Sequence, residues 1–382
     1  MARLGDICKI QSGGTPSRST LEYWNNGTIP WVKISDFEGK YLFGTTECIS
    51  QRGLDNSSAK IFPKGTILYT IFATLGEVCI LDIDAATNQA IAGLQIIDEN
   101  IIQDYLYYYL LSKKEYVNEI GRGVAQNNIN MNILRDMEIT IPSKDFQIDV
   151  SHNLGCIENL ISLRKQQLSK LDELVKSRFI EMFGDPIYNE KRWLTDSVEN
   201  VCSDIYGGGT PSKAHPEYYE NGDIPWVSSK DMKSLILYDS QIRINQLGVD
   251  NSTAKIVPIN SVIMVIRSGI LKHTLPVAIN AVPITVNQDL KVFVPSQRIT
   301  SLFLMYLFKM LEKDILSGVR AVTADNIEFN SLKERMIIVP PIDLQLEFVT
   351  FVEQVNKSKF EIQKSLEKLE TLKKALMQKY FG

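Results

Sequence analysis

The sequence predicts an α+β protein that consists of two repeated, mixed αβ domains and two long helices. We expect the helices to pair as an antiparallel coiled coil, so that the two halves are related by a pseudo-two-fold axis. Three observations predict this fold. A series of short motifs occurs twice in the same order, each copy contains short apolar runs between turn residues, and each copy ends in a long heptad pattern.

The repeat is the most specific of these observations. Gly14–Ser17 (Gly-Thr-Pro-Ser) returns as Gly209–Ser212, and Ile29–Val32 (Ile-Pro-Trp-Val) returns as Ile224–Val227. The other matched segments follow in the same order along both copies: Asn26-Gly27 with Asn221-Gly222, Ala59-Lys60-Ile61 with Ala254-Lys255-Ile256, Asn88-Gln89 with Asn287-Gln288, and Asn128-Ile129 with Asn326-Ile327. So many matches in one order indicate a duplicated unit.

The repeat divides the chain into four segments. Within each globular part, β-rich apolar runs at Ile67–Ile71 and Val262–Ile266 predict strands. Leu, Tyr and Phe at helical spacing predict helices at Gln103–Ile120 and Ile299–Ser317, and a last short strand ends at proline. The expected limits are residues 1–142 for the first domain, 143–184 for the first long helix, 185–341 for the second domain and 342–382 for the second long helix.

Both long helices carry a heptad seam, which is typical of a coiled coil. Such a helix is about 60 Å long at 1.5 Å per residue. The alternative is that each helix packs only on its own domain, but burying each large seam side chain stabilises by about 1.5–3 kcal/mol, which favours pairing. The expected pairing residues are Val150, Leu154, Ile157, Ile161, Leu168, Leu171 and Val175 in the first helix and Val352, Val355, Ile362, Leu366, Leu369 and Leu376 in the second.

The composition is that of a globular protein with reduced thiols. The chain has 382 residues, of which 44% are hydrophobic and 23% charged. No run approaches about 18 apolar residues and the N-terminal segment has no apolar core, so we expect no membrane span, no signal peptide and a cytoplasmic location. Five scattered cysteines without a C-x-x-C pair favour free thiols over disulfides or zinc.

The charge balance argues mildly against nucleic acid as a partner. The net charge is −4, whereas phosphate binding uses clustered Lys and Arg. No segment of the sequence is a basic block. A DNA-binding face would therefore be local, or a partner would supply part of the phosphate contact.

No set of catalytic residues is recognisable. The three histidines occupy unmatched positions, and there is neither a G-x-x-x-x-G-K-[ST] phosphate loop nor an Asn/Asp-Pro-Pro-aromatic motif for amino methylation. Gly207–Gly209 is interpreted as a turn, with close approach of the backbone to DNA as the alternative. A large duplicated chain without such chemistry indicates a binding protein, and we expect no metal and no cofactor in this chain.

These motifs resemble the specificity subunits of Type I restriction-modification systems over essentially the whole chain. The resemblance rests on Gly-Gly-Thr-Pro-Ser and Asn-Gly-x-Ile-Pro-Trp near the start of each half, Asn-Gln, and the proline-terminated strand. The remaining marks are Asp145-Phe146-Gln147, Asp343-Leu344-Gln345, the Met182–Pro186 junction and Trp193. Each motif is weak alone, but their order and their repetition are highly specific.

The resemblance implies a non-catalytic DNA-recognition subunit with two target-recognition domains. Each domain would bind one half of a bipartite, asymmetric target in double-stranded DNA. The helices would set the spacer and dock two modification (methyltransferase) subunits, and ATP-driven restriction subunits would join the complex. S-adenosylmethionine and ATP are then expected on these partner subunits. Half-sites read by two heads on one spacer should lie roughly one helical turn apart, about 34–36 Å.

The sequence offers candidates for contacts with DNA. Matched basic positions suggest phosphate contact, and unmatched polar positions suggest base reading by Arg, Lys, Asn or Gln. The phosphate candidates are Lys60, Lys255, Arg122 and Arg320, and the base-reading candidates are Lys33, Lys230, Gln126, Asn127, Arg267 and Lys272. Trp31 and Trp226 are expected in the core rather than stacked on bases.

Two other functions remain open at this stage. The first is a scaffold or decoy that binds modification subunits without reading DNA, which the sequence pI of about 5.6 favours. The second is an unrecognised enzyme, which only the glycine-rich turns favour.

Overall fold

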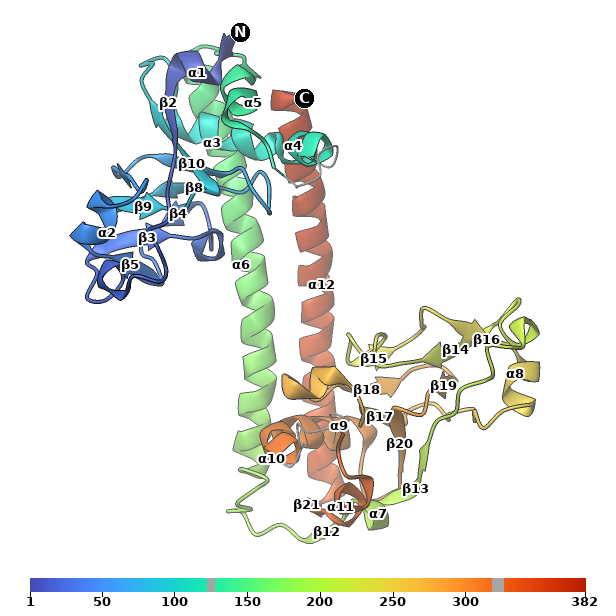
Figure 1. Cartoon of the computed structure of the whole chain (residues 1–382). Helices are drawn as coiled ribbons and strands as arrows, with labels where there is room; N and C mark the ends of the chain where they lie inside the picture. Colours follow the sequence, from blue (N-terminus) through green and yellow to red (C-terminus); the bar gives the residue numbers. More distant parts are fainter. Residues whose placement is uncertain (122–127, 318–325) are drawn as a thin grey trace. The chain divides into compact units, whose positions relative to one another are not determined.

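The computed structural model describes residues 1–121, 128–317 and 326–382, and the chain forms two compact units (Figure 1). Unit 1 contains residues 1–165 and 364–382, and unit 2 contains residues 166–363. Each unit therefore holds one sheet-bearing domain together with parts of both long helices.

Unit 1 is built on a five-stranded sheet of order β2-β10-β7-β8-β4. Its strands are β2 (Cys8–Ser12), β10 (Ile91–Ile96), β7 (Ile67–Thr70), β8 (Val78–Leu81) and β4 (Tyr41–Leu42). All neighbours are antiparallel except the parallel pair β4–β8. A second sheet has the order β5-β3-β9-β6 and a third pairs β1 with β11. These strands are β5 (Glu47–Ile49), β3 (Ile29–Val32), β9 (Ala85–Thr87), β6 (Ile61–Phe62), β1 (Ala2–Arg3) and β11 (Glu138–Ile139).

Unit 2 repeats the strand order of the five-stranded sheet. Its five-stranded sheet has the order β13-β20-β17-β18-β15, with β15–β18 as the parallel pair. The strands are β13 (Cys202–Gly207), β20 (Leu290–Pro295), β17 (Val262–Val265), β18 (Val277–Asn280) and β15 (Ile236–Leu237). The smaller sheets join β16 (Arg243–Ile244), β14 (Ile224–Val227) and β19 (Thr285–Val286), and β12 (Thr195–Ser197) with β21 (Met336–Ile338). The duplication inferred from sequence is therefore confirmed at the level of strand order.

Short helices cover the sheets and cap the loops. In unit 1 they are α1 (Leu4–Ile7), η1 (Leu21–Tyr23), η2 (Ile34–Asp36), α2 (Gln51–Asp55), α3 (Gln103–Ser112), α4 (Lys114–Gly121) and α5 (Met131–Asp136). In unit 2 they are α7 (Val198–Val201), η3 (Pro216–Tyr218), α8 (Gln246–Asp250), η4 (Gly269–Lys272), α9 (Ser301–Met310), α10 (Glu312–Ser317) and α11 (Phe329–Glu334). α3 and α9 are almost wholly buried, and their apolar side chains complete the cores with the central strands.

The two helices expected at Gln103–Ile120 and Ile299–Ser317 are each broken into two. The first breaks at Lys113 and the second at Leu311, where the backbone leaves helical geometry with ψ near zero. Neither position is glycine or proline, and the apolar spacing continues through the break. The sequence therefore carries no local signal that would stop the helix. After the break, α4 buries Val117 and α10 buries Ile315.

The long helices are α6 (Lys144–Phe183) and α12 (Ile342–Phe381), each of 40 residues. In unit 1 the start of α6 lies along the end of α12: Lys373 Nζ is 2.8 Å from Glu158 Oε1. In unit 2 the opposite ends meet, since Arg178 Nη2 is 2.8 Å from Glu347 Oε1. The pairing is therefore antiparallel within each unit (Figure 1).

All the predicted seam residues are buried or half-buried, which excludes the alternative that each helix packs only on its own domain. Toward the ends the seam also enters a domain core. Val150, Leu154 and Phe381 belong to the core of unit 1, whereas Val175 and Val352 belong to the core of unit 2. Pairing and domain packing are thus parts of one apolar cluster in each unit.

Candidate nucleic-acid interface

The glycine and tryptophan motifs of each copy pack against each other. A Cβ atom on Gly14 would lie 2.3 Å from the Ser58 carbonyl carbon, and one on Gly209 would lie 2.3 Å from that of Thr253. The buried Trp31 donates its indole N–H to the Gly14 carbonyl at 3.0 Å, and in unit 2 the matched tryptophan makes the same bond to Gly209. Close packing of the protein's own backbone therefore explains these glycines.

The Gly-Thr-Pro-Ser and Asn-Gln motifs meet through a side-chain hydrogen bond. Thr15 donates to Gln89 in unit 1, and Thr210 donates to Gln288 in unit 2. Both glutamines are exposed. Motifs that lie far apart in sequence thus converge at one end of each five-stranded sheet, where β2 and β7, or β13 and β17, end.

One further pair of residues joins each of these sheet ends. In unit 1 Phe72 forms an isolated antiparallel bridge with Asn128, and in unit 2 Arg267 forms the matching bridge with Asn326. We call the resulting surfaces the sheet-end surfaces. They consist of Thr15, Phe72, Gln89 and Asn128 in unit 1 and of Thr210, Arg267, Gln288 and Asn326 in unit 2.

The phosphate candidates Lys60 and Lys255 lie beside these surfaces. Both are exposed, and each follows directly on the segment that packs against Gly14 or Gly209. Lys255 Nζ lies 5.5 Å from the ring centroid of Tyr206. The structure therefore places both cations near a sheet-end surface, and their contact with phosphate stays a prediction.

The base-reading candidates differ in their surroundings. Lys33 Nζ is held 2.7 Å from Glu47 Oε1, and this contact, with that of Arg18, lowers the pKa of the Glu47 carboxyl below its usual value. Lys230 is exposed beside the turn at Ser228, and Lys272 is the last residue of η4. The candidates Arg122, Gln126, Asn127 and Arg320 lie outside the described residues.

Sequence reasoning missed two residues at the sheet ends. Phe72 has 43% of its surface exposed, whereas Tyr69, on the strand just before it, is fully buried. Lys291 is half-buried with Nζ 4.4 Å from the Phe329 ring centroid, and burial, followed by the charge of Arg267, lowers the pKa of its ammonium group. Its counterpart by the register of the repeat is Ala92. The signal was available, because both are unmatched positions inside a matched framework.

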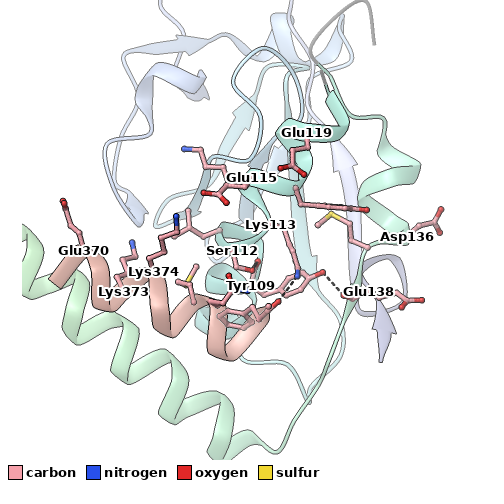
Figure 2. A pocket seen from close by; sticks show the side chains of 18 residues that line it. Tyr109, Ser112, Lys113, Glu115, Glu119, Asp136, Glu138, Glu370, Lys373 and Lys374 are labelled. Carbon is pink, nitrogen blue, oxygen red and sulfur yellow. Dashed lines mark hydrogen bonds between the residues drawn. The ribbon is translucent and has the colours of Figure 1, made fainter. Parts of the chain in front are cut away.

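A groove of about 900 Å³ borders the end of α12 in unit 1 (Figure 2). Lys113 extends into it from the break between α3 and α4 and donates to the Phe381 carbonyl at 2.8 Å. Phe381 in turn packs its ring against Tyr105, with centroids 5.2 Å apart. In unit 2 the indole of Trp193 bonds the matching Phe183 carbonyl at 2.8 Å. The groove thus marks where α12 joins the first domain.

The described residues contain no group of three or more His, Cys, Asp or Glu side chains placed to hold a metal ion. Burial raises the pKa of the Cys8 and Cys202 thiols to about 12, so neither is a nucleophile near neutral pH. In the same described part of the chain, no helix is both long and apolar enough to span a membrane.

Comparison with known proteins agrees with this architecture. The family model described as "Type I restriction modification DNA specificity domain" matches residues 1–173 and again residues 190–374. The chain belongs to this family. Its members are the DNA-recognition subunits of Type I restriction-modification systems and carry no catalytic role.

Individual relatives cover the chain to different extents. The Type I restriction enzyme MjaIX specificity subunit of Methanocaldococcus jannaschii is 27% identical over 99% of this chain and 91% of its own length. The EcoR124I/EcoR124II specificity subunit of Escherichia coli is 36% identical over 39% of this chain and 37% of its own length.

Two solved structures share the fold. The S subunit of the M. genitalium Type I restriction-modification system aligns with a TM-score of 0.59 at 14% identity, covering 100% of this chain and 95% of that one. A chain from a solved structure on assembly of the type I R-M system aligns with a TM-score of 0.63 at 18% identity, covering 100% of this chain and 96% of that one. At these identities the likeness concerns the fold alone.

Proposed function

We propose that this specificity subunit binds a bipartite, asymmetric target in double-stranded DNA, with each globular domain reading one half. The observation that carries the proposal is the pair of sheet-end surfaces. Both use the same Thr–Gln contact and the same asparagine bridge, yet they present Phe72 in one unit and Arg267 in the other. A common framework with different exposed side chains suits two related domains that read different bases.

The helices are proposed to set the spacer between the half-sites and to dock two modification subunits. Exposed apolar side chains recur at matched positions of the two helices: Ile148 and Leu346 are 52% and 50% exposed, and Leu174 and Leu372 are each 47% exposed. In each matched pair, one residue lies in unit 1 and the other lies in unit 2. Two copies of the same apolar feature, at matched positions of the two helices, fit two copies of one partner.

Chemistry is assigned to the partners. Modification subunits would bind S-adenosylmethionine and methylate adenine, and restriction subunits would bind ATP. No residue of this chain is given a step in either reaction. The net charge of −4 is consistent with this division, because partner subunits would add phosphate contacts around the DNA.

The test is single-molecule methylation mapping of a host that expresses the modification subunit with and without this chain. We expect a two-part asymmetric motif that disappears when this chain is deleted. A gel-shift assay with the purified complex distinguishes the alternative of a scaffold. Binding that is absent or independent of sequence would favour the scaffold and reject the proposal.

A further inference from the structure

Phe72 and Arg267 occupy one structural position in the two units. Each follows a fully buried central strand, β7 or β17, and each forms a single bridge to an asparagine, Asn128 or Asn326. The antiparallel register of β7 with β10 pairs Thr70 with Ile91, and that of β17 with β20 pairs Val265 with Leu290.

Extending this register by two residues places Phe72 and Arg267 each opposite the exposed glutamine of its unit. Backbone bonds support the extension, since the Ile71 N–H donates to the Ala90 carbonyl at 2.9 Å and the Ile266 N–H donates to the Asp289 carbonyl at 2.9 Å. The position therefore lies at the same place on both sheet-end surfaces, opposite Gln89 in unit 1 and Gln288 in unit 2.

In unit 2 this position carries a preoriented cation. Arg267 Nε donates to the Asn326 side-chain oxygen at 3.2 Å, which fixes the plane of the guanidinium group. Among the described residues neither Arg267 nor Lys291 forms an ion pair with a carboxylate. Both lie at the same end of the β17–β20 pair, because Lys291 is opposite Met264 and Leu290 is opposite Val265, and the charge of Arg267 contributes to lowering the pKa of Lys291. Two adjacent cations without an acidic partner suit a ligand that presents hydrogen-bond acceptors.

In unit 1 the same position is apolar. Phe72 is exposed, and Ala92, fully buried, stands where unit 2 has Lys291. The ring of Phe72 would therefore meet a ligand by apolar contact.

We infer that this position determines specificity: Arg267, with Lys291 beside it, reads a guanine through O6 and N7 in one half-site, whereas Phe72 contacts a thymine methyl group in the other. Both contacts are ordinary for a DNA major groove, where arginine pairs with guanine and phenylalanine with the thymine methyl. The inference rests on the proposed function and adds the base class that each domain prefers at this position.

The test uses the full complex of this chain with its modification subunits, and its readout is the methylated motif and the affinity for single-base variants of it. Arg267→Ala should lower discrimination for guanine at one position by about 5- to 150-fold and leave the other half-site unchanged. Arg267→Lys keeps the positive charge but not the paired N–H donors of the guanidinium group. It should lose most of the discrimination, while the salt dependence of binding stays as in the wild type.

A gain-of-function variant supplies the converse. Phe72→Arg should replace the thymine preference of the first half-site by guanine, and Ala92 is left unchanged because it is fully buried. Lys313→Ala, at an exposed lysine of α10, removes one positive charge as Arg267→Ala does; it is the control for that variant and should leave the motif unchanged. Phe72→Leu keeps an apolar side chain and should retain the thymine preference.

The outcomes distinguish failure of the proposed function from failure of the base preferences inferred for Phe72 and Arg267. If the wild-type complex yields no two-part motif, the proposed function fails and the inference falls with it. If the wild-type complex yields the motif, but Arg267→Ala and Phe72→Arg leave the base preferences of both half-sites unchanged, the proposed function stands and this inference is overturned.

Discussion

A buried glutamine at the start of each long helix gives the most quantitative test of the fold. Gln147 has no exposed surface. Its Oε1 accepts the Ile102 N–H at 2.9 Å, and its Nε2 donates to the carbonyls of Asn100 at 2.8 Å and Pro142 at 3.0 Å. One side chain therefore ties α6 to the loop before α3 and to the segment between β11 and α6.

Gln147→Ala removes all three hydrogen bonds and leaves the space of the glutamine side chain empty. At about 1 kcal/mol for each net hydrogen bond, we expect the free energy of unfolding to fall by about 3 kcal/mol. For a unit of this size about 1 kcal/mol corresponds to 2–4 °C, so the melting temperature of unit 1 should fall by roughly 6–12 °C. Calorimetry and urea unfolding followed by circular dichroism measure both quantities.

The repeat provides a matched comparison. Gln345 makes the same three bonds, to Thr300, Arg298 and Pro340, and here the Pro340 carbonyl is itself buried. Because water cannot replace the lost bond at that carbonyl, Gln345→Ala should cost more than Gln147→Ala. Gln166→Ala, at an exposed position of α6, is the control and should change stability little. A loss below about 0.5 kcal/mol for both buried glutamines would refute the reasoning.

Three further predictions follow from burial and charge. The raised pKa of Cys8 and of Cys202, about 12 against an ordinary 9.0, means that the unfolded chain loses these thiol protons first. The free energy of unfolding should therefore be independent of them below pH 9 and fall above it by about 1.4 kcal/mol per pH unit for each thiol, as urea titrations at pH 8 and 10 would measure. Lys60→Ala with Lys255→Ala should reduce the slope of log binding constant against log salt by about 1.8. Phe183→Ala, which removes a fully buried ring at the end of α6, should cost about 3–5 kcal/mol in denaturant unfolding.

Each of these has a contradicting result. A stability curve that stays as steep above pH 9 after the two thiols are replaced by alanine would assign the decline to other groups. An unchanged salt slope in the double lysine variant would remove both lysines from the phosphate contacts. A Phe183→Ala variant as stable as the wild type would show that the Phe183 cluster with Phe179, Phe303 and Phe348 does not hold the helix end in place.

Much of the fold could be predicted because its signals are local or repeated. Heptad spacing predicted α6 and α12, and the structure has them as Lys144–Phe183 and Ile342–Phe381. The repeat predicted two copies of one domain. The break at Lys113 could not be predicted in this way, because it depends on packing of α3 and α4 against the sheet rather than on a helix-stopping residue.

The candidate site was harder to predict for a physical reason. The Thr15–Gln89 contact and the Phe72–Asn128 bridge join residues that are distant in sequence, and only strand pairing brings them together. Matched motifs indicated that Thr15 and Gln89 mattered, but not that they touch. Phe72 was missed because phenylalanine is ordinarily a core residue. Its location at the exposed sheet end follows only from the strand register.

The most direct test of the central claim is to lengthen both long helices and read the DNA target. Inserting seven residues after Lys165 and seven after Gln363, which are matched positions of α6 and α12, preserves the heptad seam and adds about 10.5 Å to the pair. At about 3.4 Å per base pair, methylation mapping of the variant complex should find the same two half-sites with a spacer longer by about three base pairs. Full methylation of the original motif at its original spacing would contradict the claim that the paired helices set the distance between two reading domains.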